Sequence, residues 1–490
     1  MLFNSISFIV FFPLVLLICF VIPKRFRYIW LLFSSYYFYM SWNTKYGLLL
    51  VGVTFVTYGG ALIVEKKRKK NQCMKAKIAV GSCVVLNLSV LIFFKYLDFF
   101  SKSISELLAT IGIQIVPKAF DIVLPIGISF YVFQSLGYVV DVYRGEIYAE
   151  KNFLRYALFV SFFPQLVAGP IERSKNLLKR LAKPIEFEFE NFRDGIFLML
   201  WGYFLKLVLA DRISIFVDEV YGNWHIYSGY YLIVATGLFA FQIYCDFAGY
   251  STIAMGAARI LGVTLTDNFD APYISSSISS FWRKWHISLT TWFRDYLYIP
   301  MGGNRRRANL NKLIVFLASG LWHGADFSYV VWGGLNGVYL VIEGKIKRIL
   351  PRLDKVFHVN HQKACNRMLR GIFVFAMVDL SWIFFRASSV QEAIDIIKQI
   401  LVANNRWILF DGSLYKCGLD IAEFWVMIIA IIVLLVADWF KHKGIIIREL
   451  IKQQDGWFRY LFIALSIAVI MTFGKYGPAY DPASFIYFQF

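Results

Sequence analysis

Long apolar runs separated by short polar connectors dominate this chain. Nine runs are long enough, or dense enough in apolar residues, to be membrane spans or deeply buried helices, because about 20 apolar residues cross the hydrocarbon core of a bilayer. They are residues 3–22, 28–42, 46–64, 77–97, 122–140, 195–210, 230–247, 421–440 and 459–473. The pattern predicts an all-α integral membrane protein with about ten to twelve transmembrane helices. The first run has no basic segment before it and no small-residue cleavage site after it, which indicates a retained span.

Composition favours a single membrane domain over residues 1–490. The chain is 58% hydrophobic and 19% aromatic, and only 17% of its residues are charged, which is far from the usual balance of a soluble protein. The longest polar connectors, near residues 171–194 and 345–370, are too short to fold separately, and we expect loops with short surface helices there. The six cysteines are scattered without a CxxC pair, so we expect neither a disulfide framework nor a metal site.

The net charge of +19 is distributed in a way that indicates membrane topology. The Lys and Arg residues lie in short connectors between apolar runs, which is the positive-inside pattern of a multi-pass membrane protein. The basic groups are Lys66 to Lys70; Arg173, Lys175, Lys179, Arg180 and Lys183; Arg305 to Arg307; and Lys345, Lys347, Arg348 and Arg352. We therefore expect these connectors in the cytoplasm beside anionic lipid headgroups, and no nucleic-acid partner.

Polar residues, glycines and aromatics are concentrated between residues 240 and 345, which we expect to be the catalytic core. Near its start Asp246, Tyr250 and Ser251 interrupt an apolar helical face. Asp246 and Tyr250 are four residues apart, so they share one face of a helix and can hydrogen-bond inside the protein. The spacing fits either a contact between packed helices or a contact with substrate.

The segment from Ser280 to Pro300 predicts a helix over residues 280–298 that is too polar to cross lipid. A mainly aromatic stripe lies on one side of this helix and a polar stripe on another. The first consists of Phe281, Trp285, Leu289, Trp292 and Tyr296, and the second of Lys284, Ser288, Thr291 and Asp295. Such a helix lies in the membrane interface or enters a protein-lined cavity as a re-entrant helix. His286 adjoins the aromatic stripe, where it either packs at the interface or lines the cavity.

A basic loop follows Pro300. The run from Met301 to Arg307 contains two glycines, which end the helix, and three guanidiniums, Arg305, Arg306 and Arg307. Arginine pairs with phosphate through two parallel hydrogen bonds, so this loop, together with Lys312, is a candidate site for the phosphates of a nucleotide-like donor. An equally good interpretation is that these basic residues only set the membrane topology and bind no ligand.

His323 is the most informative polar residue, because it ends the apolar run that begins at Leu313. An imidazole at membrane depth is costly to desolvate, so it indicates a functional site. A neutral imidazole accepts a proton from a hydroxyl, as acyl transfer from a thioester to an alcohol requires. The same reaction needs stabilisation of the oxyanion and exclusion of water. Gly320 and Gly324 have a spacing that lets another backbone or a substrate approach closely.

These motifs resemble those of the membrane-bound O-acyltransferase family, and more narrowly its alginate O-acetyltransferase branch. That branch includes the membrane component of peptidoglycan O-acetylation and, further away, the D-alanyl transfer protein of teichoic acid. The matching stretches are Tyr244-Cys-Asp-Phe-Ala-Gly-Tyr-Ser251, Phe281-Trp-Arg-Lys-Trp-His-Ile-Ser-Leu289, Tyr298-Ile-Pro-Met-Gly-Gly-Asn-Arg305, Gly320-Leu-Trp-His-Gly-Ala325, Phe163 to Arg173 and Phe485 to Phe490. Several long matches in the same order make the resemblance specific, and the resemblance extends over nearly the whole chain.

The resemblance implies a ring of transmembrane helices around central re-entrant helices, with a tunnel that joins the two faces of the membrane. It makes His323 the match of the family's invariant histidine and His286 the match of a second, more variable polar position. It further implies that cytoplasmic acetyl-CoA is the donor substrate, that no cofactor is bound, and that the acetyl group is used for O-acetylation of an extracytoplasmic polysaccharide such as alginate, peptidoglycan or cellulose. The implied partners are an extracytoplasmic acetyltransferase and the machinery of polysaccharide synthesis and export.

Two other functions fit parts of the pattern. A lipid or peptide O-acyltransferase of the same family needs the same histidine. A transporter or flippase, in which His323 and His286 relay protons or bind a headgroup, normally shows inverted repeats or paired discontinuous helices, and the sequence indicates neither. No serine or cysteine stands beside a histidine in a way that marks a nucleophile, so direct transfer with His323 as general base is the simplest expectation.

Overall fold

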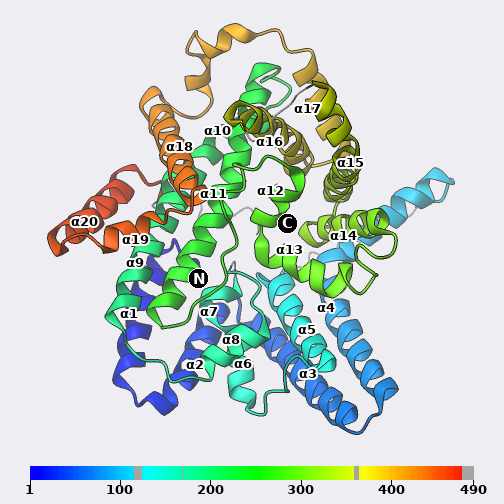
Figure 1. Cartoon of the computed structure of the whole chain (residues 1–490), viewed down its shortest axis with the longest axis vertical. Helices are drawn as coiled ribbons and strands as arrows, with labels where there is room; N and C mark the ends of the chain where they lie inside the picture. Colours follow the sequence, from blue (N-terminus) through cyan, green and yellow to red (C-terminus); the bar gives the residue numbers. More distant parts are fainter. Residues whose placement is uncertain (115–123, 168, 358–362, 477–490) are drawn as a thin grey trace. The chain divides into compact units, whose positions relative to one another are not determined.

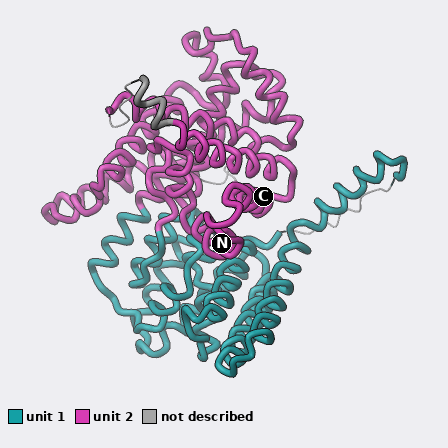
Figure 2. The backbone as a smooth tube through the Cα atoms, turned by 45° about the vertical axis from the view of Figure 1, so that its right-hand side comes forward, with its two compact units in different colours: residues 1–199, 251–266 teal, residues 200–250, 267–490 magenta. Residues whose placement is uncertain are grey.

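The computed structural model describes residues 1–114, 124–167, 169–357 and 363–476. Within these ranges every regular element is helical and no strand occurs, which confirms the all-α class. The chain divides into two compact units, residues 1–199 with 251–266 and residues 200–250 with 267–490 (Figure 2). The expectation of a single domain over residues 1–490 remains a prediction.

Six helices in the described ranges are long and apolar enough to cross a membrane. They are α3 (Thr44–Lys69), α4 (Cys73–Thr110), α11 (Tyr230–Ile260), α16 (Ala364–Arg386), α18 (Ile421–His442) and α20 (Gly456–Phe473). Five of them coincide with predicted apolar runs, and the sixth is α16. The helix α1 (Ile6–Val21) is apolar but shorter. The expected total of ten to twelve spans remains a prediction.

Three other apolar runs form helices that are not among the six candidate spans, and one predicted connector is wrong. Residues 28–42 form α2 (Arg27–Met40), residues 195–210 lie in α9 (Phe189–Tyr203) and the π-helix η2 (Phe204–Ala210), and residues 124–140 of the run 122–140 lead into α5 (Ile128–Arg144). In its described residues, the connector expected at 345–370 is instead the end of α15 (Phe327–Phe357) and, from Ala364, the start of α16. Basic residues at both helix ends interrupt the apolar pattern there, which is why the sequence did not predict α16 as a span.

In the first unit, α3, α4 and α5 pack side by side (Figure 1). Nearly all of α5 is buried, so its polar side chains need partners inside the protein. Gln134 on α5 donates to the carbonyl oxygen of Phe159 at 2.6 Å, and Gln165 donates to Gln134 Oε1 at 2.8 Å. These bonds tie α5 to the short helices that follow. The other helices of this unit are η1 (Lys24–Phe26), α6 (Phe153–Ser161), α7 (Phe163–Leu166) and α8 (Ser174–Leu181).

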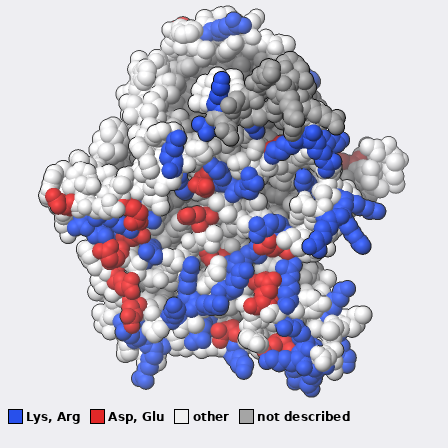
Figure 3. Space-filling model, in the orientation of Figure 1, with Lys and Arg blue, Asp and Glu red and all other residues white. Residues whose placement is uncertain are grey.

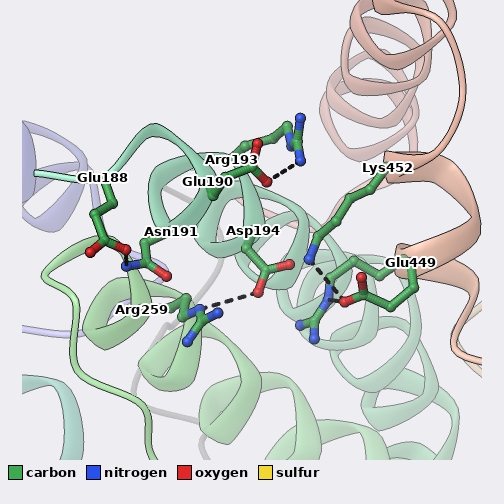
Figure 4. Close-up of polar contacts among 9 residues, drawn as sticks. Glu188, Glu190, Asn191, Arg193, Asp194, Arg259, Glu449 and Lys452 are labelled. Atoms are coloured by element: carbon green, nitrogen blue, oxygen red, sulfur yellow. Dashed lines mark hydrogen bonds and ion pairs between the residues drawn. The ribbon is translucent and has the colours of Figure 1, made fainter.

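The first part of α9 packs tightly against the last turns of α11 in the same unit. A Cβ atom on Gly195 would lie 2.5 Å from the carbonyl oxygen of Gly256, so only glycine fits at this approach. Beside it Arg259 Nε pairs with Asp194 Oδ2 at 3.2 Å (Figure 4). The glycine contact and the ion pair together hold the end of α11 on α9.

The second unit contains the segments that carry the candidate chemistry. Its helix α14 (Ala308–His323) forms an antiparallel pair with the start of α15. The remaining elements of this unit are α10 (Asp211–Gly222), α12 (Ile278–Lys284), α13 (Ile287–Phe293), the π-helix η3 (Arg294–Tyr298), α17 (Val390–Leu401), η4 (Arg406–Leu409), η5 (Ser413–Lys416) and α19 (Ile447–Lys452). Almost none of α20 is buried inside the protein, as expected for a helix that faces lipid.

Basic side chains gather in patches on the face drawn in Figure 3. At the end of α3, Lys66, Arg68, Lys69 and Lys70 are exposed. The loop that precedes α14 exposes three consecutive arginines. Both groups lie at helix ends, where the positive-inside pattern places charge.

Candidate active site

The chain breaks at His286, so the single helix predicted over residues 280–298 is wrong. The helix α12 ends at Lys284, Trp285 is extended, and His286 has φ 43° and ψ 55°, a left-handed conformation that is rare outside glycine. A new helix, α13, begins at Ile287. The apolar periodicity continues through both short helices, and neither glycine nor proline marks the break. Only tertiary contacts hold such a conformation, so the sequence pattern could not reveal it.

His323 is the last residue of α14, and glycines bring that helix close to α15. A Cβ atom on Gly320 would lie 2.2 Å from the carbonyl oxygen of Tyr329, and one on Gly324 would lie 2.1 Å from the Tyr329 ring. On the facing helix, a Cβ atom on Gly333 would lie 2.2 Å from the carbonyl oxygen of Phe316. The close approach predicted for Gly320 and Gly324 is confirmed, and the approaching group is α15.

The two histidines lie together. Their ring centroids are 6.4 Å apart, and the ring of Trp322 contacts both, at 6.0 Å from His286 and 4.9 Å from His323. His323 also packs edge-on against Trp332 at 5.1 Å and Phe385 at 5.3 Å. We call these five residues the histidine cluster. Its members come from the α12–α13 break, the end of α14, and the helices α15 and α16 (Figure 1).

The two histidines are buried, and buried indole N–H groups lie in and next to the histidine cluster, where Trp282 packs against Trp332 at 5.7 Å. His286 is 1% exposed and His323 is 5% exposed. His286 lies outside the six candidate spans, and its burial lowers its pKa below the ordinary value, so its imidazole is neutral near pH 7. The Nε1 atoms of Trp282 and Trp332 are buried and have no hydrogen-bond partner among the described residues. Each is an N–H group available to an oxygen of a bound molecule.

Asp246 and Tyr250 meet a lysine that the sequence analysis did not single out. Lys206, on the π-helix η2, pairs with Asp246 at 2.6 Å and with Asp211 at 2.7 Å, and all three side chains are at most 3% exposed. The Lys206 ammonium also lies 5.3 Å from the centre of the Tyr250 ring. Asp246 and Tyr250 do share one face of α11, and that face holds a buried ion cluster. A π-helix is often found at a functional site, which is a weak signal that structure alone provides.

The basic loop before α14 has a defined conformation. Asn311, which is buried, donates from Nδ2 to the carbonyl oxygens of Gly303 at 2.9 Å and Arg306 at 2.7 Å. Arg305, Arg306 and Arg307 are exposed, and Lys312 is half-buried. Sequence reasoning missed Asn311, because an asparagine in the first turn of a helix carries no signal of a contact with the preceding loop.

The basic loop and the histidine cluster lie at opposite ends of α14. This helix has 16 residues between Arg307 and Gly324, and thus a length of about 24 Å at 1.5 Å per residue. The structure therefore brings His286 and His323 together but separates them from the arginines. In the described ranges, no group of three or more His, Cys, Asp or Glu side chains is placed to hold a metal ion.

Comparison with known proteins identifies the family. The model of the membrane-bound O-acyltransferase family matches residues 18–385. The chain belongs to this family. It is a multi-pass membrane O-acyltransferase, and the transporter alternative is set aside.

Three proteins illustrate what this chain is similar to. A probable alginate O-acetylase of Pseudomonas aeruginosa is 36% identical over 80% of this chain and 73% of its own length. A peptidoglycan O-acetyltransferase of Helicobacter pylori is 32% identical over 77% of this chain and 74% of its own. A teichoic acid D-alanyltransferase of Bacillus subtilis is 26% identical over 44% of this chain and 58% of its own. The resemblance derived from the sequence motifs is confirmed, although the C-terminal motif from Phe485 to Phe490 lies outside the described residues.

Proposed function

We propose that this protein moves an acetyl group from cytoplasmic acetyl-CoA across the bacterial cytoplasmic membrane for O-acetylation of an extracytoplasmic polysaccharide. The observation that carries the proposal is the pair His286 and His323, whose rings lie 6.4 Å apart among buried aromatic side chains. The names of the alginate and peptidoglycan relatives support both the acetyl group and a glycan as its destination.

In this proposal His323 is the general base. The acceptor hydroxyl attacks the carbonyl carbon of the thioester while His323 removes its proton, and the C–S bond then breaks. The same proton passes from the imidazolium to the departing thiolate, so that free CoA and an acetyl ester are the products. Burial of His323 among Trp322, Trp332 and Phe385 supports this role, because a dry site limits hydrolysis of the thioester.

The oxyanion of the transition state needs hydrogen-bond donors. A neutral imidazole has one N–H group, so His286 is a donor within reach of a substrate held beside His323. The Nε1 group of Trp332 is a second donor, on a ring 5.1 Å from that of His323. His286 thus stabilises negative charge without itself removing a proton.

The basic loop binds the phosphates of CoA in this scheme. Pantetheine is an extended arm that joins the phosphates of CoA to its thioester, so the two ends of one donor molecule can lie at opposite ends of α14. Arg305, Arg306, Arg307 and Lys312 would hold the phosphates on the cytoplasmic side. Asp246 and Tyr250 do not contact the substrate in this scheme, because both side chains interact with Lys206 inside the protein.

The acceptor side requires partners. An extracytoplasmic acetyltransferase would take the acetyl group and deliver it to the polysaccharide, beside the machinery that makes and exports the polymer. The membrane lipids are the remaining partners, and CoA leaves as a product, so no bound cofactor is needed.

The test uses purified protein in proteoliposomes with radiolabelled acetyl-CoA. We expect release of CoA thiol together with label on an added glycan or on the partner enzyme, and neither with His323→Ala. A well-folded wild-type protein that binds acetyl-CoA but transfers label to none of these acceptors would contradict the proposal. Label on a lipid alone would favour a lipid O-acyltransferase.

A further inference from the structure

We propose that Asn268 is a positioning residue that holds His286 in the histidine cluster by capping the start of α13. The inference rests on the proposed function insofar as His286 acts on the substrate. Its structural part, that Asn268 maintains the left-handed backbone at His286, stands on the contacts of this segment alone.

The start of α13 is capped in an unusual way. The first N–H groups of a helix have no partner within the helix, and the side chain of the residue before it normally accepts one of them. That residue is His286, and its imidazole makes no cap contact. Asn268 accepts these N–H groups instead. Its backbone carbonyl oxygen accepts the N–H of Ile287 at 2.9 Å. The imidazole of His286 therefore takes no part in this cap, and it packs within the histidine cluster.

The Asn268 side chain completes the cap. Its Oδ1 atom accepts the hydroxyl of Ser288 at 2.6 Å and the N–H of Ser288 at 3.3 Å. Asn268 is 1% exposed and Ser288 is 3% exposed, so water cannot easily replace these bonds. One side chain therefore satisfies two donors directly beside the strained residue.

The segment that carries Asn268 is itself held on both sides of that residue. The N–H of Asp270 donates to the carbonyl oxygen of Lys284 at 3.0 Å, just before the break. The ring of Phe269 packs edge-on against Trp285 at 5.1 Å, and its carbonyl oxygen accepts Lys441 Nζ at 2.7 Å. The irregular stretch from Asn268 to Asp270 thus lies against both ends of the break and fixes Asn268 opposite α13.

These contacts make the conformation of His286 dependent on Asn268. A non-glycine residue stays left-handed only where its surroundings over-determine the backbone. Without the Oδ1 acceptor, the Ser288 donors are buried without that partner, and a shift of α13 restores hydrogen bonding by letting residue 286 return to an ordinary conformation. That shift carries the imidazole away from His323.

The test compares two isosteric variants. Asn268→Asp keeps the acceptor oxygens, whereas Asn268→Leu keeps the volume and removes them. We expect Asn268→Leu to lower kcat at least tenfold with the KM for acetyl-CoA changed less than twofold, and Asn268→Asp to retain more activity than Asn268→Leu. In a His286→Ala background, Asn268→Leu should cause no further loss, because both changes remove the same contribution.

Other results would overturn the assignment. They are a kcat for Asn268→Leu above half of wild type, or an equal loss in the wild-type and His286→Ala backgrounds. If Asn268→Leu does not fold, Ser288→Ala, which removes the 2.6 Å bond and leaves the N–H cap, should still lower kcat. An unchanged kcat in that variant contradicts the proposal.

A structural measurement separates this inference from the proposed function. A wild-type protein without acetyl transfer would refute the function whatever Asn268 does. A cryo-EM structure of Asn268→Leu, or of Ser288→Ala if the former does not fold, should show residue 286 out of the left-handed region and the two imidazoles further apart. An unchanged backbone there would refute the role of Asn268 even if transfer is confirmed.

Discussion

The imidazole of His286 and the imidazole of His323 lie 6.4 Å apart between ring centroids, with 61° between their planes. One belongs to a helix break and the other ends a helix, so their relative position depends on how α13 and α14 pack. In the proposed function, a substrate oxygen would hydrogen-bond to a nitrogen of each ring, at about 3 Å. This spacing suits one base and one donor acting on a single acyl group.

His323→Ala and His323→Gln should abolish acetyl transfer. Removal of a general base costs about 100- to 10,000-fold in rate, and glutamine cannot replace the base although it keeps hydrogen-bonding capacity. Transfer from acetyl-CoA in proteoliposomes is the measurement, with the thermal unfolding of each variant as the control for folding. More than a tenth of wild-type transfer in a folded variant would exclude His323 as the base.

His286→Asn should preserve more activity than His286→Ala, because asparagine keeps an N–H donor. Burial lowers the pKa of His286, so it is neutral at and above pH 6 and does not titrate in that range. The pH dependence of kcat above pH 6 should therefore be the same in His286→Asn as in wild type. If both variants match the wild-type rate, His286 is a packing residue. If kcat depends on pH above pH 6 in the wild type but not in His286→Asn, the neutral state of His286 is contradicted.

Charge reversal in the basic loop should weaken donor binding. Arg306→Glu is expected to raise the KM for acetyl-CoA about tenfold with little change in kcat, because a contact remote from the reacting atoms contributes equally to ground and transition states. Arg305, Arg307 and Lys312 are tested in the same way. Lys398→Glu, in an exposed pair on α17, is the matched control. A fall in kcat at constant KM would assign the loop another role, and unchanged kinetics in all four variants would leave it a topology signal.

Gly333→Ala should destabilise the α14–α15 pair. The new Cβ atom would lie 2.2 Å from the carbonyl oxygen of Phe316, and overpacking of this kind costs about 1–3 kcal/mol. The neighbouring Gly334→Ala is the control, because its Cβ atom would meet only Leu317, at 3.5 Å. Thermal unfolding in detergent distinguishes them. Equal unfolding midpoints in the two variants would show that α14 and α15 accommodate the added methyl group without loss of stability.

Lys206→Met should lower stability strongly. It leaves Asp211 and Asp246 buried without their cation, and breaking a buried ion pair in this way costs about 3–5 kcal/mol. Lys398→Ala removes an exposed i,i+3 pair with Asp395, which contributes about 0.5 kcal/mol or less. The two unfolding midpoints should differ clearly. A Lys206→Met protein as stable as Lys398→Ala would show that this buried ion cluster does not stabilise the fold.

The sequence by itself determined the class and the family, and it singled out the two histidines as candidate site residues. Apolar runs of spanning length dictate helices, because backbone groups in lipid must be bonded within the segment, and five of the six candidate spans follow from them. His323 was evident because an imidazole at the end of an apolar run is expensive. The glycines beside it also predicted the close approach that α15 makes.

Only the tertiary structure decided how these residues are arranged. The break at His286, its cap by Asn268, and the pairing of Asp246 with Lys206 all join residues distant in sequence. Periodicity reports which side of a helix is apolar, but it does not reveal a left-handed residue that distant contacts hold in place. The helix α16 was missed because the charges at its ends interrupt the apolar run, and only the folded structure shows that Trp382 and Phe385, in its last turns, pack in and beside the histidine cluster. Burial and contact, which are properties of the folded chain, brought the two imidazoles together.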